Sequence, residues 1–170
     1  ESPMREPTLS AAHKVYNIAH WSDGYIDVNA RGEVLIRPVR GHSGEDINLP
    51  DLTRSLVSEW AQLPVLIRLT AILHDRVNKL CGAFNKVARE HGYQGGYTAV
   101  YPIKVNQQRR VVEELLCAEP AASDNQIGLE AGSKPDLMAV LALSRQQESV
   151  IVGNGYKDRE YIRLALIGQK

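Results

Sequence analysis

The sequence has 170 residues, in which 20 Lys and Arg balance 20 Asp and Glu, and 44% of the residues are hydrophobic. This length and composition are typical of a globular protein with a buried core, and they exclude disordered and fibrous proteins. Because the net formal charge is zero, nothing attracts the chain as a whole to nucleic acid or to an anionic membrane. We therefore expect a small-molecule substrate, no nucleic acid and no membrane.

The sequence also bears on the compartment. No apolar stretch is long enough to span a membrane, and no segment resembles a signal peptide. Cys81 and Cys117 match no metal spacing and fall in helical patterns, which indicates reduced thiols of an intracellular protein. The first residue is Glu1 rather than Met, and Lys170 falls inside a predicted helix, so we expect a piece of a longer protein.

The amino-terminal part is predicted to be a short flexible segment followed by strands. Residues 1–13 are mostly polar and are expected to be flexible, and residues 14–69 are expected to be part of a β domain with a short helix. Two β-prone runs, 25–29 and 33–37, flank Gly32 and predict a hairpin.

Three more elements follow before the glycine-rich segment at 92–96. Apolar spacing predicts a short helix over 51–60, and a third β-prone run covers 64–69. A longer amphipathic helix is predicted from Thr70, as its cap, to about residue 90.

From residue 96 onward the chain repeats a unit of a strand and a helix. The predicted strands are 97–103, 126–131 and 149–153, and the predicted helices are 107–118, 134–145 and one from about 158. Such crossovers join parallel neighbours in a right-handed sense, so the fold is predicted to be α/β. Since a complete (β/α)8 barrel needs eight units, three units imply either an open sheet or a missing remainder.

Lys104, Glu130 and Asn154 lie at the carboxyl ends of these strands, so we expect them on one edge of the sheet, where α/β proteins place their chemistry. The neutral amine of a partly desolvated lysine can condense with an aldehyde to form a Schiff base, and pyridoxal phosphate is the cofactor that most often uses such a lysine. Position alone leaves two alternatives open: a solvated ammonium group, or an ion pair between Lys104 and Glu130. Glu130 either tunes the lysine or serves the next helix start, for which Ser133 and Asp136 form a capping signal.

Other polar residues give weaker signals. The five histidines have no spacing that predicts a zinc site. Arg109 and Arg110 begin a helix, where they could meet a phosphate, although a solvated helix face is commoner. Asn154 and Gly155 form an ordinary turn pair.

Three segments in the same order and spacing, 101–107, 128–134 and 154–162, closely resemble the biosynthetic arginine decarboxylase family, and the likeness extends upstream to 16–18 and 25–29. The resemblance implies a fold like that of alanine racemase and ornithine decarboxylase, with a (β/α)8 TIM barrel and a separate β domain. The chain would then be an amino-terminal fragment: part of the β domain, followed over 70–170 by the first three units of the pyridoxal-phosphate-binding barrel.

The resemblance also implies the chemistry. Lys104 would hold pyridoxal 5'-phosphate as a Schiff base, and L-arginine would be converted to agmatine and carbon dioxide, the first step of a route to putrescine and spermidine. An acidic residue near the position of Glu130 lies close to the cofactor lysine in more distant ornithine decarboxylases. The phosphate-binding loop and the partner of the pyridinium nitrogen would lie outside the fragment, which is expected to have little activity alone.

The resemblance further implies magnesium, with no ligands identifiable here, and a homo-oligomer, either a dimer or a tetramer. The expected compartment is the cytoplasm, with the periplasm as the alternative. Other functions remain open: decarboxylation of ornithine or diaminopimelate, racemisation, a non-catalytic pyridoxal-phosphate-binding barrel, or a flavodoxin-like module in which Lys104 is structural.

Overall fold

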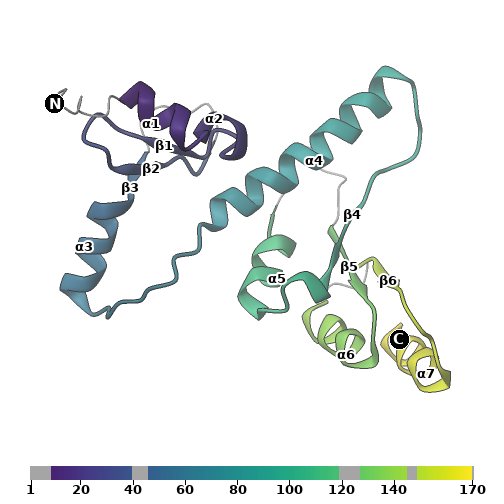
Figure 1. The fold of residues 1–170 in the computed structure, drawn as a ribbon. Helices are drawn as coiled ribbons and strands as arrows, with labels where there is room; N and C mark the ends of the chain where they lie inside the picture. The colour runs from purple at the N-terminus through teal and green to yellow at the C-terminus, as the bar shows by residue number, and fades with distance from the viewer. Residues whose placement is uncertain (1–8, 40–45, 119–126, 145–148, 170) are drawn as a thin grey trace, which may run out of the picture. The chain divides into compact units, whose positions relative to one another are not determined.

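The computed structural model of the chain describes residues 9–39, 46–118, 127–144 and 149–169. The chain divides into two compact units, Glu1–Ile72 and Leu73–Lys170 (Figure 1). No helix in the described ranges is long and apolar enough to cross a bilayer.

The first unit contains a small antiparallel sheet in which β2 lies between β1 and β3. The predicted hairpin is confirmed: Gly32 has a φ of +77° in its turn, and Asn29 Oδ1 accepts the backbone N–H groups of Arg31 and Glu33 at 2.9 and 3.0 Å. The elements of this unit are α1 (Leu9–Val15), α2 (Ile18–Trp21), β1 (Ile26–Val28), β2 (Val34–Ile36), β3 (Ile47–Asn48) and α3 (Leu49–Glu59).

Helix α1 lies partly within the segment 1–13 that was expected to be flexible. Residues 1–8 lie outside the described ranges, but Leu9 begins a helix whose interior contains two alanines, the residue with the highest helix propensity. His13 Nε2 lies 2.8 Å from Asp27 Oδ1, and this contact ties the helix to β1. The sequence pattern did not indicate the helix because its support comes from a residue 14 positions away.

Asp27 also connects β1 with β2. Its Oδ1 accepts the Val28 N–H at 2.8 Å, and its Oδ2 lies 2.9 Å from Arg37 Nη2. Burial alone would raise the pKa of Asp27, but the hydrogen bonds from Val28 and His13 and the charge of Arg37 together hold that pKa below its usual range. The ionised carboxylate therefore stabilises this sheet.

The stretch from α3 to α4 differs in part from its prediction. The β-prone run 64–69 is irregular rather than a strand, since no strand of the described chain pairs with it and Leu66 is exposed. Helix α3 begins two residues earlier than expected because Asn48 caps it, with Oδ1 accepting the Asp51 N–H at 3.0 Å. Helix α4 spans Thr70–Glu90, which confirms the predicted helix.

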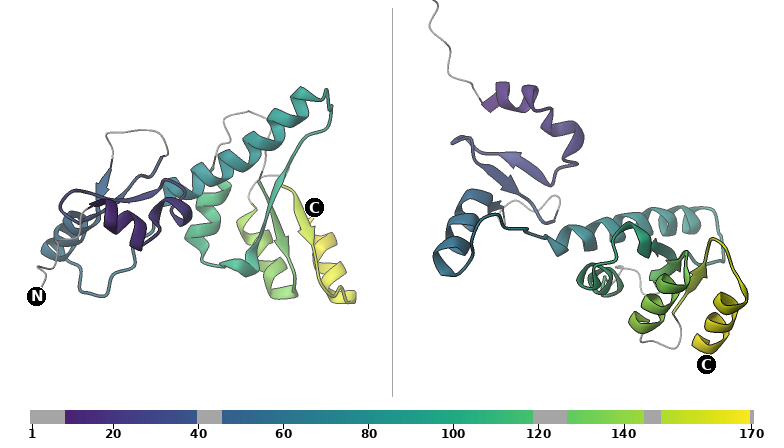
Figure 2. Two further views of the ribbon diagram at one scale, coloured as in Figure 1. Left: turned by 45° about the horizontal axis from the view of Figure 1, so that its top comes forward. Right: turned by 60° about the horizontal axis from the view of Figure 1, so that its bottom comes forward.

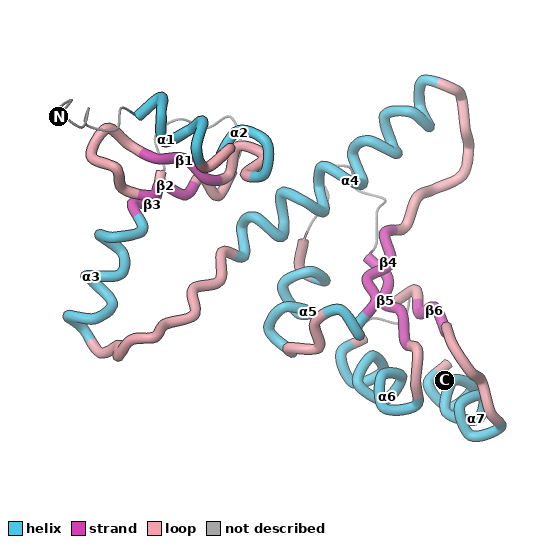
Figure 3. The backbone as a smooth tube through the Cα atoms, viewed as in Figure 1, coloured by secondary structure: helices cyan, strands magenta, loops and turns pink. Residues whose placement is uncertain are grey.

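The second unit contains a parallel sheet with the order β4, β5, β6, which Figure 3 shows in magenta. Its strands are β4 (Ala99–Pro102), β5 (Ile127–Ala131) and β6 (Ile151–Gly153), and its further helices are α5 (Arg109–Leu116), α6 (Lys134–Leu143) and α7 (Arg159–Gly168). The three predicted strand–helix units are thus confirmed, although residues 126 and 145 at the ends of two predicted elements lie outside the described ranges. Helices α6 and α7 pack side by side (Figure 2).

One face of this sheet packs against the helices and forms the core of the unit. The core side chains are Ile103, Val112, Leu129, Ala131, Leu137, Val140 and Tyr161. On the other face Val150 and Val152 are 38% and 39% exposed. Gly128 lies in close contact with Val150 and Val100 on either side of it. A Cβ on Gly128 would lie 2.8 Å from Val150 O and 3.3 Å from Val100 Cγ2, so the strands leave no space for a side chain there.

Candidate functional site

The carboxyl ends of β4, β5 and β6 meet at one edge of the sheet. Pro102 lies opposite Glu130, and Ala131 lies opposite Gly153. The structure therefore confirms that the residues at the carboxyl ends of these strands, Lys104 and Glu130 among them, share one edge. We call this edge the rim, defined by Lys104, Glu130 and Asn154.

Lys104 lies in a single 3-10 turn, Ile103–Val105, rather than at the end of a longer strand. The ladder ends at Pro102, which has no N–H to donate. Ile103 is buried and anchors the turn in the core, whereas Lys104 is exposed. Within the described chain the Lys104 amine has no hydrogen bond or ion pair, so the Lys104–Glu130 ion pair that the sequence left open does not form.

Glu130 is engaged with Asn154 instead. Asn154 Nδ2 donates to Glu130 Oε1 at 3.1 Å, across the edge from β6 to β5. The Asn154 N–H donates to Ala131 O at 2.8 Å, and its Oδ1 accepts the Gly155 N–H at 2.7 Å. The pair Asn154-Gly155, interpreted from the sequence as an ordinary turn, therefore links two strand ends. No sequence signal indicated this, because the contact joins residues 24 positions apart.

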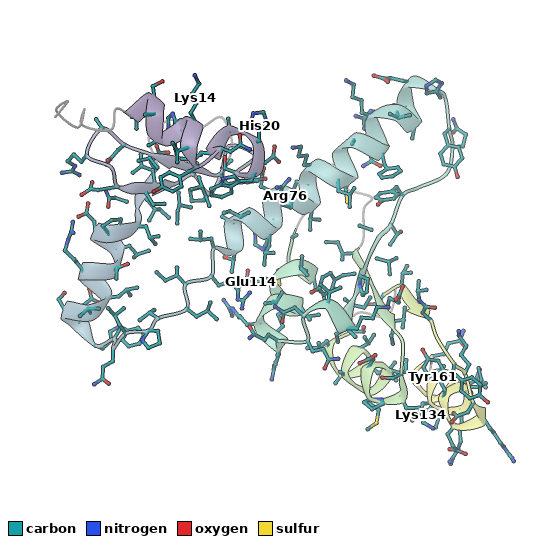
Figure 4. The ribbon with its side chains drawn as sticks, in the orientation of Figure 1. Lys14, His20, Arg76, Glu114, Lys134 and Tyr161 are labelled. Atoms are coloured by element: carbon teal, nitrogen blue, oxygen red, sulfur yellow. The ribbon has the colours of Figure 1, made fainter. Side chains whose placement is uncertain are left out.

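Tyr161 is a buried residue of this site that the sequence analysis did not single out. Its hydroxyl donates to Ala131 O at 2.9 Å, so that one carbonyl accepts both the Tyr161 O–H and the Asn154 N–H. Burial raises the pKa of Tyr161, and the negative charges of Asp136 and Glu130 add to the shift. Figure 4 labels Tyr161 on α7 and Lys134 at the start of α6.

The starts of α6 and α7 are each capped by a side chain, and an ion pair joins them. Ser133 Oγ accepts the Asp136 N–H at 3.3 Å, which confirms the predicted cap, while Asp136 Oδ2 accepts the Gly132 N–H at 3.3 Å rather than that of Ser133. Asp158 Oδ1 accepts the Tyr161 N–H at 2.9 Å and caps α7. The Lys134 ammonium bonds to the Asp158 carboxylate and, together with this capping bond, lowers the pKa of Asp158.

These contacts distinguish three lysines near the strand ends. Lys134 is engaged by Asp158, and Lys157 Nζ donates to Gly155 O at 3.1 Å. Lys104 has no such partner in the described residues. An amine that follows a buried anchor and has no competing partner is the group best suited to form a covalent bond with a carbonyl compound.

The remaining candidates have structural roles. Arg109 and Arg110 lie 2.7 Å from Glu113 and Glu114 on the same helix, which favours the solvated helix face over a phosphate site. His74, on α4, lies 3.2 Å from Glu114, which Figure 4 labels on α5. Across the described ranges, no group of three or more His, Cys, Asp and Glu side chains could hold a metal ion.

Both cysteines are free thiols. Cys81 is buried in α4, and burial raises its pKa, whereas Cys117 is exposed. Neither lies in the rim as defined above, so the chemistry of this edge depends on the amine, the carboxylate and the amide.

Residues 76–170 match a family described as "Pyridoxal-dependent decarboxylase, pyridoxal binding domain". A protein of Marinobacter nauticus named biosynthetic arginine decarboxylase is 77% identical over 98% of this chain and 26% of its own length. A protein of the same name from Shewanella frigidimarina is 49% identical over the same shares of the two chains. The crystal structure of the biosynthetic arginine decarboxylase SpeA from Campylobacter jejuni matches with a TM-score of 0.75 and 31% identity, over 90% of this chain and 24% of that one.

The chain thus spans about a quarter of the length of these relatives. Together with the parallel sheet, the structural likeness confirms the predicted fold class: an α/β chain that holds the first three units of a (β/α)8 barrel.

Proposed function

The chain belongs to the pyridoxal-dependent decarboxylase family, and on that premise we propose that the protein of which it forms part is an arginine decarboxylase. The proposed reaction converts L-arginine to agmatine and carbon dioxide, and the agmatine is then used to make putrescine and spermidine. The relatives named for this activity support the substrate. One structural observation carries the proposal: the segment that matches the pyridoxal binding domain holds the exposed amine of Lys104 at the carboxyl edge of a parallel sheet, and no described residue bonds to that amine.

Lys104 is the residue proposed to bind pyridoxal phosphate. The donor set of the rim fits this cofactor, because a primary amine can bind its aldehyde and a nearby carboxylate can balance the positive charge that the bound nitrogen carries. When bound, the cofactor supplies an electron-poor ring that accepts the electrons left when the substrate loses its carboxyl group.

The residues of this chain have separate tasks in that reaction. Lys104 Nζ would hold the cofactor covalently, and when released it would be a free amine at the rim that can accept or donate a proton. Glu130 provides negative charge on the same edge, which favours the protonated form of a nearby nitrogen. Ile103, which is 1% exposed, fixes the turn from which Lys104 extends, so that the amine leaves and returns from a constant position.

Borohydride reduction tests the Lys104 assignment in the full-length enzyme loaded with pyridoxal phosphate. Reduction fixes the cofactor on its lysine, and peptide mapping then locates the label, which is expected on Lys104. The variant Lys104→Ala is expected to lose the label and the visible absorbance of the bound cofactor. Lys86→Arg is the matched control, because Lys86 is an exposed lysine of α4 paired only with Glu90, at 3.9 Å, in the described chain. A label on any other lysine would refute the assignment.

A substrate panel tests the reaction. Release of carbon dioxide is measured with arginine, ornithine and diaminopimelate, and racemisation of each is followed by chiral chromatography. We expect agmatine from arginine as the main product. Preferred release from ornithine or diaminopimelate, or racemisation without release, would contradict the arginine assignment while leaving the cofactor assignment intact.

We extend the proposal to the assembly and its surroundings on the strength of the family resemblance. The full protein is proposed to be a homo-oligomer, a dimer or a tetramer, that uses magnesium and works in the cytoplasm. Sedimentation analysis and assays with a chelator check the first two points. The domain limits 1–13, 14–69 and 70–170 stay predictions.

A further inference from the structure

We propose that Asn154 is a positioning residue, which holds the Glu130 carboxylate in place at the rim so that it acts on Lys104. This inference rests on the proposed function, since the role of Glu130 there depends on a cofactor bound to Lys104. It adds a residue from the loop after β6 to a site otherwise built from β4 and β5.

Asn154 is fixed by three hydrogen bonds. Its N–H donates to Ala131 O at 2.8 Å, its Oδ1 accepts the Gly155 N–H at 2.7 Å, and its Nδ2 donates to Glu130 Oε1 at 3.1 Å. Because Oδ1 faces an N–H donor, the amide can present only its NH2 group to the carboxylate. The orientation of the side chain is therefore set by the backbone of its own loop.

The two loops that carry these groups are in close contact. Gly155 has a φ of +74°, and a Cβ there would lie 2.6 Å from Gly132 O, so the loop after β6 lies directly against the loop after β5. Tyr161 strengthens the junction through its hydroxyl bond to Ala131 O. Asn154 is consequently attached to β5, the strand that carries Glu130, rather than to a free loop.

The other charged groups nearby already have partners. Asp136 accepts hydrogen bonds from Gly132 N–H and from Gln107 Nε2, the latter at 3.0 Å. Lys134 and Asp158 pair with each other, and Lys157 donates to Gly155 O. Among the described residues of this edge, Glu130 is therefore the carboxylate that remains for Lys104, and the bond from Asn154 occupies one of its two oxygens.

The test uses the full-length enzyme loaded with pyridoxal phosphate and follows the absorbance of the bound cofactor against pH. A negative charge on the same edge favours the protonated form of the bound nitrogen, so Glu130→Gln is expected to lower the midpoint of the absorbance change by about one pH unit. Asn154→Ala keeps the negative charge of Glu130 but removes the hydrogen bond that fixes its position. It is expected to lower the midpoint by roughly half as much. Added to Glu130→Gln, Asn154→Ala is expected to change the midpoint no further.

Ser133→Ala is the matched control. It removes a neutral hydrogen bond from the neighbouring loop, the one to the Asp136 N–H, without touching Glu130 or Asn154, and its midpoint is expected to equal that of the unmodified enzyme. Should Asn154→Ala fail to fold, Asn154→Ser is titrated instead, because serine keeps an acceptor for the Gly155 N–H but has no amide to donate to Glu130. The same lowering is expected.

The outcomes separate the two proposals. An enzyme that shows no absorbance of a lysine-bound cofactor would overturn the proposed function itself. If that absorbance is present, an unchanged midpoint in the Asn154 variants would overturn the positioning role. So would a shift that is as large in the Glu130→Gln background as in the unmodified enzyme, or one that Ser133→Ala reproduces.

Discussion

The hydroxyl of Tyr161 offers a measurement of how tightly the ends of β5 and β6 are joined. Tyr161→Phe removes one of the two hydrogen bonds to Ala131 O and leaves the other, from the Asn154 N–H at 2.8 Å. Since the carbonyl keeps a partner, the expected loss of stability is that of a single hydrogen bond, about 1 kcal/mol, and not the larger cost of a buried unsatisfied group.

A second substitution tests the geometry. A Cβ on Gly153 would lie 3.0 Å from the Tyr161 hydroxyl oxygen, so Gly153→Ala crowds that oxygen. The phi angle of Gly153 is not positive, and alanine there reduces the entropy of the unfolded chain, which stabilises by about 0.4–1 kcal/mol where nothing clashes. In the unmodified protein the crowding is expected to cancel this gain, whereas in the Tyr161→Phe background the gain is expected to appear.

The double-mutant cycle should therefore give a favourable coupling of roughly 0.5–1 kcal/mol. Because long chains often unfold in several steps, the quantity to measure in the full-length protein is the local opening free energy of β5 and α7, from hydrogen–deuterium exchange. Equal effects of Gly153→Ala in both backgrounds would refute the reasoning about the close approach. A loss of about 3 kcal/mol or more for Tyr161→Phe would be the cost of leaving a buried polar group unsatisfied. Such a loss would refute the two-donor description of Ala131 O.

Three further outcomes follow from the same structure. Asp158→Ala removes the α7 cap and is expected to cost about 1 kcal/mol, while Asp158→Asn keeps a capping oxygen and should cost less; urea unfolding that ranks them in reverse would contradict the cap. Gly155→Ala is expected to destabilise by at least about 1 kcal/mol, because alanine at positive φ would also meet Gly132 O, and an unchanged unfolding midpoint would count against that contact. The lowered pKa of Asp27 means that its stabilisation is fully present above its unfolded pKa, about 4, and is lost as pH falls through the lower folded pKa. The stability difference between the unmodified protein and Asp27→Asn should thus be largest near neutral pH and shrink below about pH 4, and a difference that does not change with pH would contradict the role of the ionised carboxylate.

The repeated strand–helix units were predictable because each strand is a short β-prone run, α5 and α7 have a clear apolar periodicity, and Ser133 marks the start of the largely apolar α6. Their bounds followed the pattern within a few residues. The run 64–69 has the same composition as a strand but none of the described strands pairs with it, which shows that β propensity needs a neighbour to become a strand. Helix α1 was not predicted because its stabilising contact comes from Asp27, a residue outside the helix that the local sequence pattern does not include.

The candidate site was predictable only in part. The position of Lys104 after a strand placed it on the correct edge, because parallel strands share a direction. The pattern could not show that Glu130 binds Asn154 rather than Lys104, since that choice depends on the register of β5 and β6. Nor could it show that Tyr161 and Asn154 share a single carbonyl oxygen, which only the packed structure brings together.

Gly128 limits which substitutions evolution can accept in this protein. Any other amino acid would bring its β carbon to 2.8 Å from a carbonyl oxygen of the adjoining chain segment, and main-chain atoms cannot be exchanged for smaller ones by a compensating mutation. Gly82 and Gly96 have open space around them, so a randomised library should recover many replacements at those two codons and glycine alone at codon 128.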